Sequence, residues 1–395
     1  MRCAIFVSLL LIASGVDADD WQGEVSIGTR YFVQSTPDPR QDQWDGVLSG
    51  TLGYFNDWDD NRQRFALALT ARVDSDDPAR NLVDIGEMYW RYRWQRAEIA
   101  VGIDRVFWGV TEALHLVDVI NQSDLTANPD SEDKLGQPMV RLTLTPRWGT
   151  LDVLLMPRFR ERRFPGSRGR LRGPIQVRTD ATQFESADAR NHLDIAARYS
   201  HYVGPFEFAV AHFAGTQRQP LFVPLPVNQT APALAVAPVY FLTDQSSIEL
   251  TYARGSWLWK LEALSGREPQ GRGFAATGGF EYTWSRPFNT SFDVGVIAEY
   301  QYDERRAAII LGADDDLVAG MRIGFNDLSG SELLLLAGSD LSGDGRLFSL
   351  EASRRLGQHW RAALEARFFS ASDANDTLAL LAREDYWQLS VTRFF

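Results

Sequence analysis

The last ten residues of the chain, 386–395, constrain the fold more than any other stretch. Reading backward from the end, every second residue except Arg393 is apolar: Phe395, Val391, Leu389 and Trp387. The residues between them are mostly polar. A repeat of two is the side-chain period of a β-strand, so the stretch predicts a strand with one apolar and one polar face. A soluble protein rarely ends an exposed strand on an aromatic pair, so the apolar face predicts a lipid environment.

The same alternation recurs from Gln22 onward in segments of about ten residues, as in transmembrane β-barrels. The polar faces carry charged side chains as well as Ser and Thr. We count about 18 strands, and the three weakest segments, 238–254, 331–340 and 344–356, leave 16 as the alternative. The predicted strands are 22–33, 44–55, 62–74, 82–94, 96–104, 138–146, 149–158, 191–201, 205–215, 238–254, 256–266, 273–284, 289–302, 317–325, 331–340, 344–356, 359–370 and 384–395.

Tryptophan and tyrosine gather at the ends of these segments. A soluble β-sandwich would also alternate, but it would bury its aromatic residues in the middle of its strands. Aromatic girdles at two lipid interfaces give the observed distribution. We therefore predict an all-β fold, a closed antiparallel transmembrane β-barrel. The aromatic residues concerned are Tyr54, Trp90, Trp94, Trp257, Trp284, Tyr300, Tyr302, Trp360 and Trp387.

The connections between the predicted strands alternate in length. Those after even-numbered strands are short, and the longest ones all follow odd-numbered strands. Short turns at one end and long loops at the other are typical of outer-membrane barrels, with the turns periplasmic and the loops extracellular. An even strand count also places both termini in the periplasm. The longest predicted loops are 105–137, 159–190, 216–237, 303–316 and 371–383.

Residues 1–18 are predicted to be a secretory signal peptide. Arg2 is followed by a short apolar segment, and small residues precede the expected cleavage after Ala18. A buried N-terminal helix is the alternative. The only cysteine, Cys3, lies inside this segment, so the mature chain is expected to be free of disulfides. Residues 19–395 are then expected to form one barrel, with the inserted loop 105–137, in the bacterial outer membrane.

Composition excludes several functions. The formal net charge of -12 argues against a nucleic-acid partner. No apolar run long enough for a membrane helix follows residue 18. The five histidines show no metal-ligand spacing, and no motif of a hydrolase or a phosphate-binding loop is found. We therefore expect no enzyme activity, no metal and no cofactor.

The segment after the fifth predicted strand is too apolar for a solvated loop. It contains Arg105 followed by Trp108-Gly109, then Glu112, then Asp118-Val119 with Asn121 and Asp124. These residues resemble a motif in a mostly uncharacterised family of proteobacterial outer-membrane proteins, whose nearest characterised types are alginate-export barrels and general porins. The resemblance covers some 20 residues closely and the rest only in pattern. It implies a large barrel with a role in export or passive diffusion.

We expect the inserted loop to fold into the lumen and narrow it. Apolar side chains would anchor it on the wall: Trp108, Leu114, Leu116 and Val119. Charged side chains would face the water path and set selectivity: Asp104, Arg105, Glu112, Asp118 and Asp124. The alternative is a lid that lies over the mouth of the barrel without a role in selectivity.

A second loop concentrates arginine in an otherwise acidic chain. Because guanidinium groups bind carboxylates and phosphates in bidentate fashion, the loop predicts an anion contact. The anion is lipopolysaccharide phosphate if the loop stays at the outer rim, or an anionic solute if it bends inward. The arginines are Arg158, Arg160, Arg162, Arg163, Arg168, Arg170 and Arg172.

The sequence therefore predicts a channel for passive passage or export of a hydrophilic solute. The alternative is a closed barrel that serves as a surface-anchored interaction or structural module. The expected partners are outer-membrane lipids, lipopolysaccharide and the barrel-assembly machinery. The stretch ending at Phe395 resembles the C-terminal strand that this machinery recognises, with a departure at Arg393. A homo-oligomer is an open alternative to a monomer.

Overall fold

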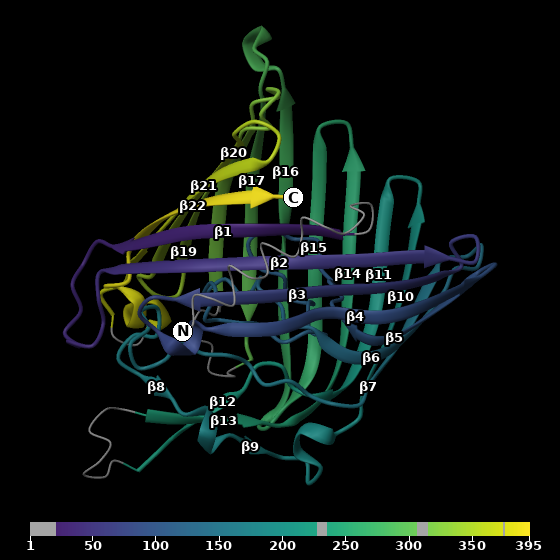
Figure 1. The fold of residues 1–395 in the computed structure, drawn as a ribbon, viewed down its shortest axis with the longest axis horizontal. Helices are drawn as coiled ribbons and strands as arrows, with labels where there is room; N and C mark the ends of the chain where they lie inside the picture. Colours follow the sequence, from purple (N-terminus) through teal and green to yellow (C-terminus); the bar gives the residue numbers. More distant parts are fainter. Residues whose placement is uncertain (1–20, 227–234, 306–314, 374–375) are drawn as a thin grey trace.

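Eighteen strands form one closed sheet in the computed structural model, which describes residues 21–226, 235–305, 315–373 and 376–395 (Figure 1). The predicted signal peptide lies outside the described residues. The strand count therefore confirms 18 rather than 16. The barrel strands are β1 (Trp21–Phe32), β2 (Trp44–Trp58), β3 (Gln63–Asp74), β4 (Leu82–Trp94), β5 (Ala97–Asp104), β6 (Gln137–Leu144), β7 (Thr150–Met156), β10 (Asp194–Val203), β11 (Phe206–Thr216), β14 (Leu242–Arg254), β15 (Trp257–Glu268), β16 (Gly271–Ser285), β17 (Asp293–Asp303), β18 (Asp315–Gly324), β19 (Glu332–Asp340), β20 (Arg346–Arg355), β21 (Trp360–Ser370) and β22 (Tyr386–Phe394).

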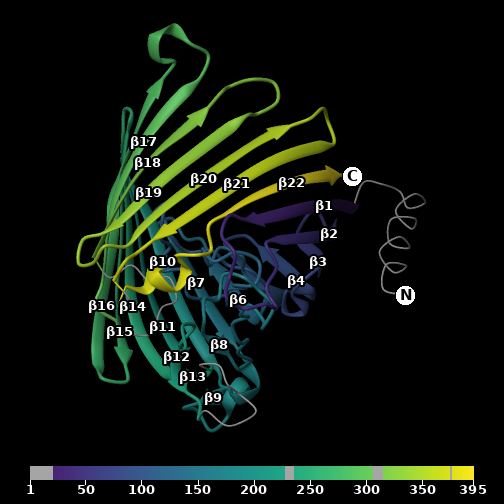
Figure 2. The ribbon, with the colours of Figure 1, turned by 90° about the vertical axis from the view of Figure 1, so that its left-hand side faces the viewer.

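Every barrel strand pairs antiparallel with its two neighbours, and β22 closes the barrel on β1. Ile27 of β1 lies opposite Val391 of β22 in the register of this seam. Figure 2 shows β17 to β22, in green to yellow, continuing the wall to β1. Closure pairs the backbone polar groups of every strand on both sides, which a sheet needs if it is to lie in lipid.

The alternation seen in the sequence separates the two faces of the wall. In β15, Trp257, Trp259 and Leu261 point outward and are exposed, whereas Glu262 and Leu264 point into the barrel and are buried. Outward aromatic residues concentrate at both ends of the strands, as the predicted girdles require. The outward apolar face can therefore meet hydrocarbon while the inner face carries polar groups.

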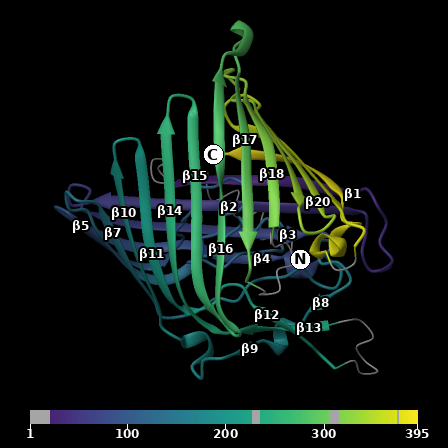
Figure 3. The same cartoon turned by 180° about the vertical axis from the view of Figure 1, so that it is seen from behind.

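The two ends of the barrel differ as predicted. Tight turns join β4 to β5 and β14 to β15, and the longest connections all emerge at the opposite end. The connections after β7 and β11 combine there into a small sheet of β8 (Gln176–Val177), β9 (Gln183–Phe184), β12 (Leu221–Pro224) and β13 (Ala235–Tyr240). Figures 1 and 3 show this sheet beside the long-loop end of the wall.

One predicted strand is corrected. The segment 238–254 is not continuous, because β13 ends at Tyr240, Phe241 follows it, and β14 begins at Leu242. The run 239–242 around the break is apolar, so alternation does not mark the break, and Pro238 shortly before it is the local sign of an interruption. The break occurs because β13 pairs with the loop strands and β14 with the barrel.

Short 3-10 helices punctuate the connections: η1 (Pro78–Arg80), η2 (Thr179–Ala181), η3 (Ala189–Asn191), η4 (Pro287–Asn289) and η5 (Thr377–Leu381). Across the described ranges, no helix has the length and apolar character needed to cross a membrane.

Candidate functional site

The inserted loop runs from the end of β5 to the start of β6 and lies inside the barrel. Its apolar side chains Trp108, Val117 and Ile120 are buried in one cluster with residues on the inner faces of β6, β7, β10 and β11. Met139 and Phe213 are two of these wall residues. Burial of this much apolar surface holds the first part of the loop on the wall, and it places Trp108 as the sequence predicted.

Gly109 redirects the loop toward β15, further round the wall. Its φ of 140° is a conformation that side chains with a Cβ rarely adopt. The turn aims the next two backbone N–H groups, of Val110 and Thr111, at Oε1 of Glu262 on β15, at 2.6 and 2.9 Å. The N–H group of Val117 donates to the other oxygen of Glu262 at 3.1 Å. The fully buried Glu262 therefore has both its oxygens bound by the loop backbone.

A second wall carboxylate extends this attachment. Glu299 of β17 accepts hydrogen bonds from the N–H groups of Glu112 and Ala113, at 2.7 and 2.9 Å. Hydrogen bonds to charged groups each contribute about 1.5–3 kcal/mol. The five bonds to the two carboxylates carry the loop from the wall around β6 to the wall of β15–β17, so the loop crosses part of the lumen.

Asn121 fastens the base of the loop. Its side-chain amide donates to the carbonyl oxygens of Asp104 and Leu135, at 3.0 and 2.9 Å. Its side-chain oxygen accepts from the N–H group of Val106 at 2.9 Å. The asparagine of the sequence motif therefore holds the beginning and the end of the loop together.

Buried ion pairs hold the second half of the loop. Asp124 accepts from Arg72 of β3 at 2.6 Å and from Arg163 at 3.0 Å. Lys134 lies 3.0 Å from the buried carboxylate of Asp118, and burial lowers the pKa of this lysine. Burial also lowers the pKa of Arg163. Each of these charges has a partner of opposite sign, which offsets the free-energy cost of burying it.

The tip of the loop contacts the wall near the seam. Asp130 accepts from Arg367 of β21 at 2.7 Å, and Glu132 and Asp133 follow it in the sequence. Burial inside the barrel and the charges around them raise the pKa of Glu132 to about 7 and that of Asp133 to about 6. The Glu132 side chain is nevertheless 63% exposed, so water of the lumen reaches it and weakens these effects.

The wall beyond the loop carries exposed charges. Arg322 of β18 lies 2.6 Å from Glu112 of the loop and 3.9 Å from Glu281, and its side chain is 42% exposed. Lys260 is near the same two carboxylates, at 3.7 and 3.8 Å. Next to this group, a pocket of about 230 Å³ opens on the inner wall of β18–β22, where Arg322 is one of its lining residues. This side of the lumen is polar and open to water.

The charged side chains that were predicted to face the water path form two groups, one accessible to the lumen and one buried. Glu112 and Arg105 are in contact with the lumen, since Glu112 meets Arg322 and the Arg105 side chain is 40% exposed. Asp104, Asp118 and Asp124 are buried, which corrects the expectation that they face the water path. They are buried because each meets a cation from elsewhere in the chain, which for Asp104 is Arg141 at 3.2 Å.

The apolar side chains that were predicted to anchor the loop are all buried or partly buried. Trp108 and Leu116 are buried, and Val119 packs against the Trp108 cluster. Leu116 contacts Leu264 of β15 in a separate small cluster. Leu114 is half-buried and its carbonyl oxygen accepts from the hydroxyl of Thr111 at 2.6 Å.

Most guanidinium groups of the arginine-rich loop, from Arg158 to Arg172, form hydrogen bonds or ion pairs within the protein. Arg160 binds Asp84 at 2.7 Å, Arg162 binds Gln122 at 3.0 Å, and burial lowers the pKa of Arg162. The pairs at the long-loop end are Arg170 with Glu384 at 2.7 Å and Arg172 with Asp38 at 2.8 Å.

Two arginines of that loop remain outside these pairs. Arg158 and Arg168 are exposed, and within the described ranges neither guanidinium has an ion-pair partner. They are the members of the loop that stay accessible to an external anion. Hydrogen bonding with Arg40 first, and also with Arg172, holds the pKa of Asp38 well below its usual range, so the Asp38–Arg172 pair stays charged.

Glu262, Lys260 and Arg322 are site residues that no sequence pattern singles out. Each occupies an inward position of a strand, where a charge facing a wet lumen needs no special partner. The signal that could have identified Glu262 is a carboxylate flanked by the inward Leu264, in a strand whose outward face is strongly apolar. Its partners are backbone groups of a distant loop, which no side-chain pattern reveals.

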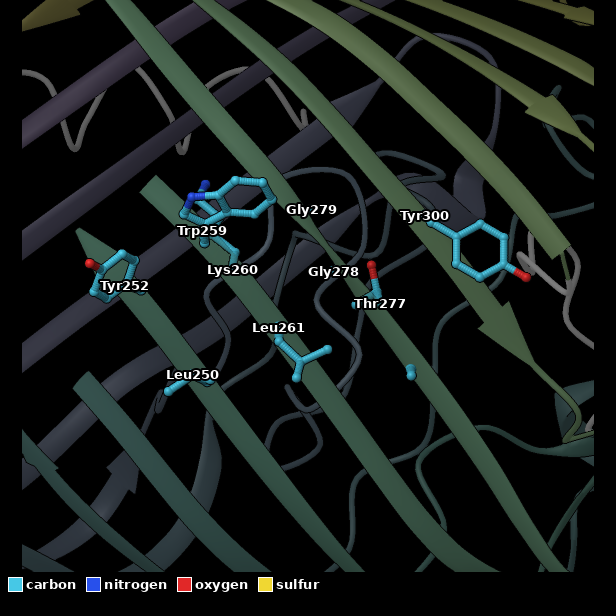
Figure 4. A pocket seen from close by; sticks show the side chains of 10 residues that line it. Leu250, Tyr252, Trp259, Lys260, Leu261, Thr277, Gly278, Gly279 and Tyr300 are labelled. Atoms are coloured by element: carbon cyan, nitrogen blue, oxygen red, sulfur yellow. The ribbon is translucent and has the colours of Figure 1, made fainter. Parts of the chain in front are cut away.

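A larger depression lies on the outward wall and is separate from this site. Its volume is about 390 Å³, and Tyr252, Trp259, Leu261 and Tyr300 surround Gly278 in it (Figure 4). Gly278 pairs with Leu261 on one side and Tyr300 on the other, so the missing side chain leaves the depression between them. It belongs to the apolar surface that meets the surroundings of the barrel.

No cluster of three or more His, Cys, Asp or Glu side chains suited to a metal ion occurs in the part of the chain that the structure describes.

Comparisons with known proteins support the fold. No protein-family model matches the chain, and no curated protein matches it. Among solved structures it is similar to Wzi, an outer-membrane protein involved in group 1 capsule assembly in Escherichia coli and a carbohydrate-binding β-barrel. The TM-score is 0.54 at 8% identity, over 98% of this chain and 86% of that one.

Two further solved structures are among the matches. OpdQ of Pseudomonas aeruginosa gives a TM-score of 0.54 at 10% identity, over 96% of this chain and 99% of that one. A mutant of the Rh. blastica porin gives 0.45 at 11% identity, over 95% and 99%. At these identities the likeness to Wzi and OpdQ concerns the fold alone, and it agrees with the closed barrel described above.

Proposed function

We propose that this chain is a bacterial outer-membrane channel through which a small hydrophilic solute diffuses past the inserted loop. The observation that carries the proposal is the attachment of the loop across part of the lumen by Glu262 and Glu299, beside a wall that stays wet. The exposed charges Arg322 and Glu351 lie on that wall. A fixed obstruction beside a charged, water-accessible surface is the arrangement of a selective pore.

The membrane assignment rests on the outward surface. Apolar residues face outward along the strands and aromatic residues gather at both ends, which suits a hydrocarbon layer between two interfaces. The fold likeness to the outer-membrane protein Wzi supports the same location. In this proposal the short turns are periplasmic, β22 is the strand read by the barrel-assembly machinery, and Arg158 and Arg168 contact lipopolysaccharide phosphates.

The direct test is the conductance of the refolded protein in a planar lipid bilayer, with ion selectivity from the reversal potential. Stable conductance steps are expected, and deletion of residues 106–122 should enlarge them because it removes most of the obstruction. Conductance that is unchanged by this deletion would place the narrowest point elsewhere and remove the role assigned to the loop.

A closed barrel that acts as a surface-interaction module is the second candidate. The long-loop end favours it, because Arg170 and Glu384 form a nearly inaccessible ion pair there and loops from several connections pack together. The fold shared with a carbohydrate-binding barrel is compatible with this role. A protein that shows the heat-modifiable gel mobility of a folded barrel but gives no conductance would support this candidate over the channel.

A further inference from the structure

The pocket on the inner wall of β18–β22 combines both charges with an apolar floor. The strand register aligns Arg322 of β18 with Leu334 of β19, and Leu334 with Glu351 of β20. All three line the pocket. Neighbouring strands lie about 4.8 Å apart, so the backbones of Arg322 and Glu351 are about 10 Å apart, with Leu334 between them.

The two charged side chains keep binding capacity. Arg322 is 42% exposed and has Glu112 as its close partner, and Glu351 is 49% exposed with Arg367 at 3.2 Å. A guanidinium has five donors and a carboxylate about four acceptor positions, so one contact leaves most of each free. The other arginine of the pocket, Arg361, is already held by Glu332 at 3.0 Å.

The lining restricts the class of solute. A simple anion would approach Arg322 but would also meet the three glutamates, Glu332, Glu351 and Glu365. A simple cation would meet two guanidinium groups. Among the residues that the structure describes, no aromatic side chain lines the pocket, so a sugar ring would find no flat apolar face there. A molecule that carries both charges and an apolar group matches all of these features.

We infer that this pocket binds a small zwitterion of the amino-acid class. The carboxylate of the solute pairs with Arg322, its ammonium group pairs with Glu351, and its apolar side chain lies on Leu334. The volume of about 230 Å³ is enough for a molecule of that size. The inference rests on the proposed channel for its physiological meaning and names the class of solute that the channel favours.

The test is equilibrium binding of radiolabelled leucine to the detergent-purified barrel, with glucose as a neutral probe of comparable size. Arg322→Gln and Glu351→Gln should each weaken leucine binding about tenfold or more, since each removes a charge-assisted hydrogen bond. Arg346→Gln is the matched control, because Arg346 lies at the end of β20 and does not line the pocket. Heat-modifiable gel mobility verifies that each variant is folded.

Arg322→Lys provides a second variant. It should keep more leucine affinity than Arg322→Gln, because the positive charge that pairs with Glu112 and with the solute carboxylate is retained. Absence of leucine binding by the wild type, equal binding of glucose, or equal affinities in Arg322→Gln and Arg346→Gln would each overturn the inference. Conductance reports on the proposed function separately: a silent barrel that binds leucine through Arg322 keeps the pocket and loses the channel.

Discussion

The two halves of the inserted loop are held inside the barrel by different forces. The first half, 105–121, is held by buried apolar side chains and by backbone hydrogen bonds to Glu262 and Glu299. The second half, 122–137, is held mainly by ion pairs, of which Asp124 with Arg72 and Asp130 with Arg367 are the closest.

This difference makes the two halves respond to different perturbations. Salt should have little effect on either half, because the carboxylates that hold the first half and the pairs Arg72–Asp124 and Arg367–Asp130 of the second half are buried or nearly so. The second half differs in carrying Glu132 and Asp133, whose pKa values are raised, so its attachment is the one expected to depend on pH. Single cysteines can report on each half, at Leu116 and at Leu135, because both side chains are buried.

The largest expected effect is the loss of the carboxylate at Glu262. Glu262→Ala leaves three backbone N–H groups of the loop without their acceptor, which should weaken docking of the first half by about 3–5 kcal/mol. In a Leu116→Cys background, the rate of labelling by a maleimide should rise at least about 100-fold. The probe in a Leu135→Cys background should respond much less.

Glu207→Gln is the matched control for this change, because Glu207 lies on β11 near the short-turn end and is exposed. It should leave both labelling rates unchanged. Equal acceleration at both probes in Glu262→Ala would show that the loop moves as one unit, and the division into two halves would be abandoned.

A smaller effect with the opposite pattern is expected at Arg367. This guanidinium lies within 3.2 Å of three carboxylates, Asp130, Glu351 and Glu365. Arg367→Gln removes the charge that they share, at a cost of about 2–3 kcal/mol to docking of the second half, since partial protonation can relieve the repulsion. The probe at Leu135 should then be labelled faster while the probe at Leu116 is little affected.

The attachment of the second half should also weaken as pH rises. Burial first, and then the charges of Asp130 and Glu351, raise the pKa of Glu132 from 4.5 to about 7. The docked loop thus binds this proton more tightly than the free loop, so docking is strongest below pH 4.5 and is weakened as pH rises through 7. Because the side chain is largely exposed, the change between pH 5 and pH 8 should stay below about 1 kcal/mol.

The ratio of labelling rates at the two probes measures this pH effect, because the reactivity of the thiol itself cancels in the ratio. The ratio for Leu135 over Leu116 should rise by up to about fivefold between pH 5 and pH 8. A ratio that falls over this range would contradict the assigned sign.

The smallest expected effect is that of Glu132→Gln. An uncharged side chain removes the repulsion at high pH, so the docked state should gain no more than about 1 kcal/mol at pH 8 and nothing at pH 5. The labelling ratio should become flat between pH 6 and pH 8. A pH dependence that survives this change would assign the titration to Asp133, whose pKa is raised to about 6.

Most of the barrel could be predicted from the sequence because its strands obey a local rule. The side-chain period of two is set by backbone geometry and by lipid on one face, so segments such as 82–94 are predicted with their observed bounds. The exception, 238–254, is a place where two consecutive strands join different sheets. Which sheet a strand joins depends on partners far along the chain, and alternation alone carries no such information.

The site was predicted only in part, for a related reason. The apolar character of Trp108 and Leu116 is enough to predict that the loop packs on a wall. The burial of Asp118 and Asp124 could not be predicted, because it depends on Lys134, Arg72 and Arg163 approaching them in space. Charged side chains are usually solvated, and only the folded structure shows where a counter-charge offsets the free-energy cost of burying one.

The seam between β1 and β22 has a consequence for the order of assembly. Arg30 of β1 and Gln388 of β22 are hydrogen-bonded although they are 358 residues apart in the chain. Contacts this distant form late, because the entropy of closing such a long loop must be overcome before they form. The tip of the loop is bonded to Arg367 of β21, 237 residues away from Asp130, so this contact also belongs to the late stage. The last steps of assembly are therefore expected to join the wall to itself and to join the end of the loop to the wall.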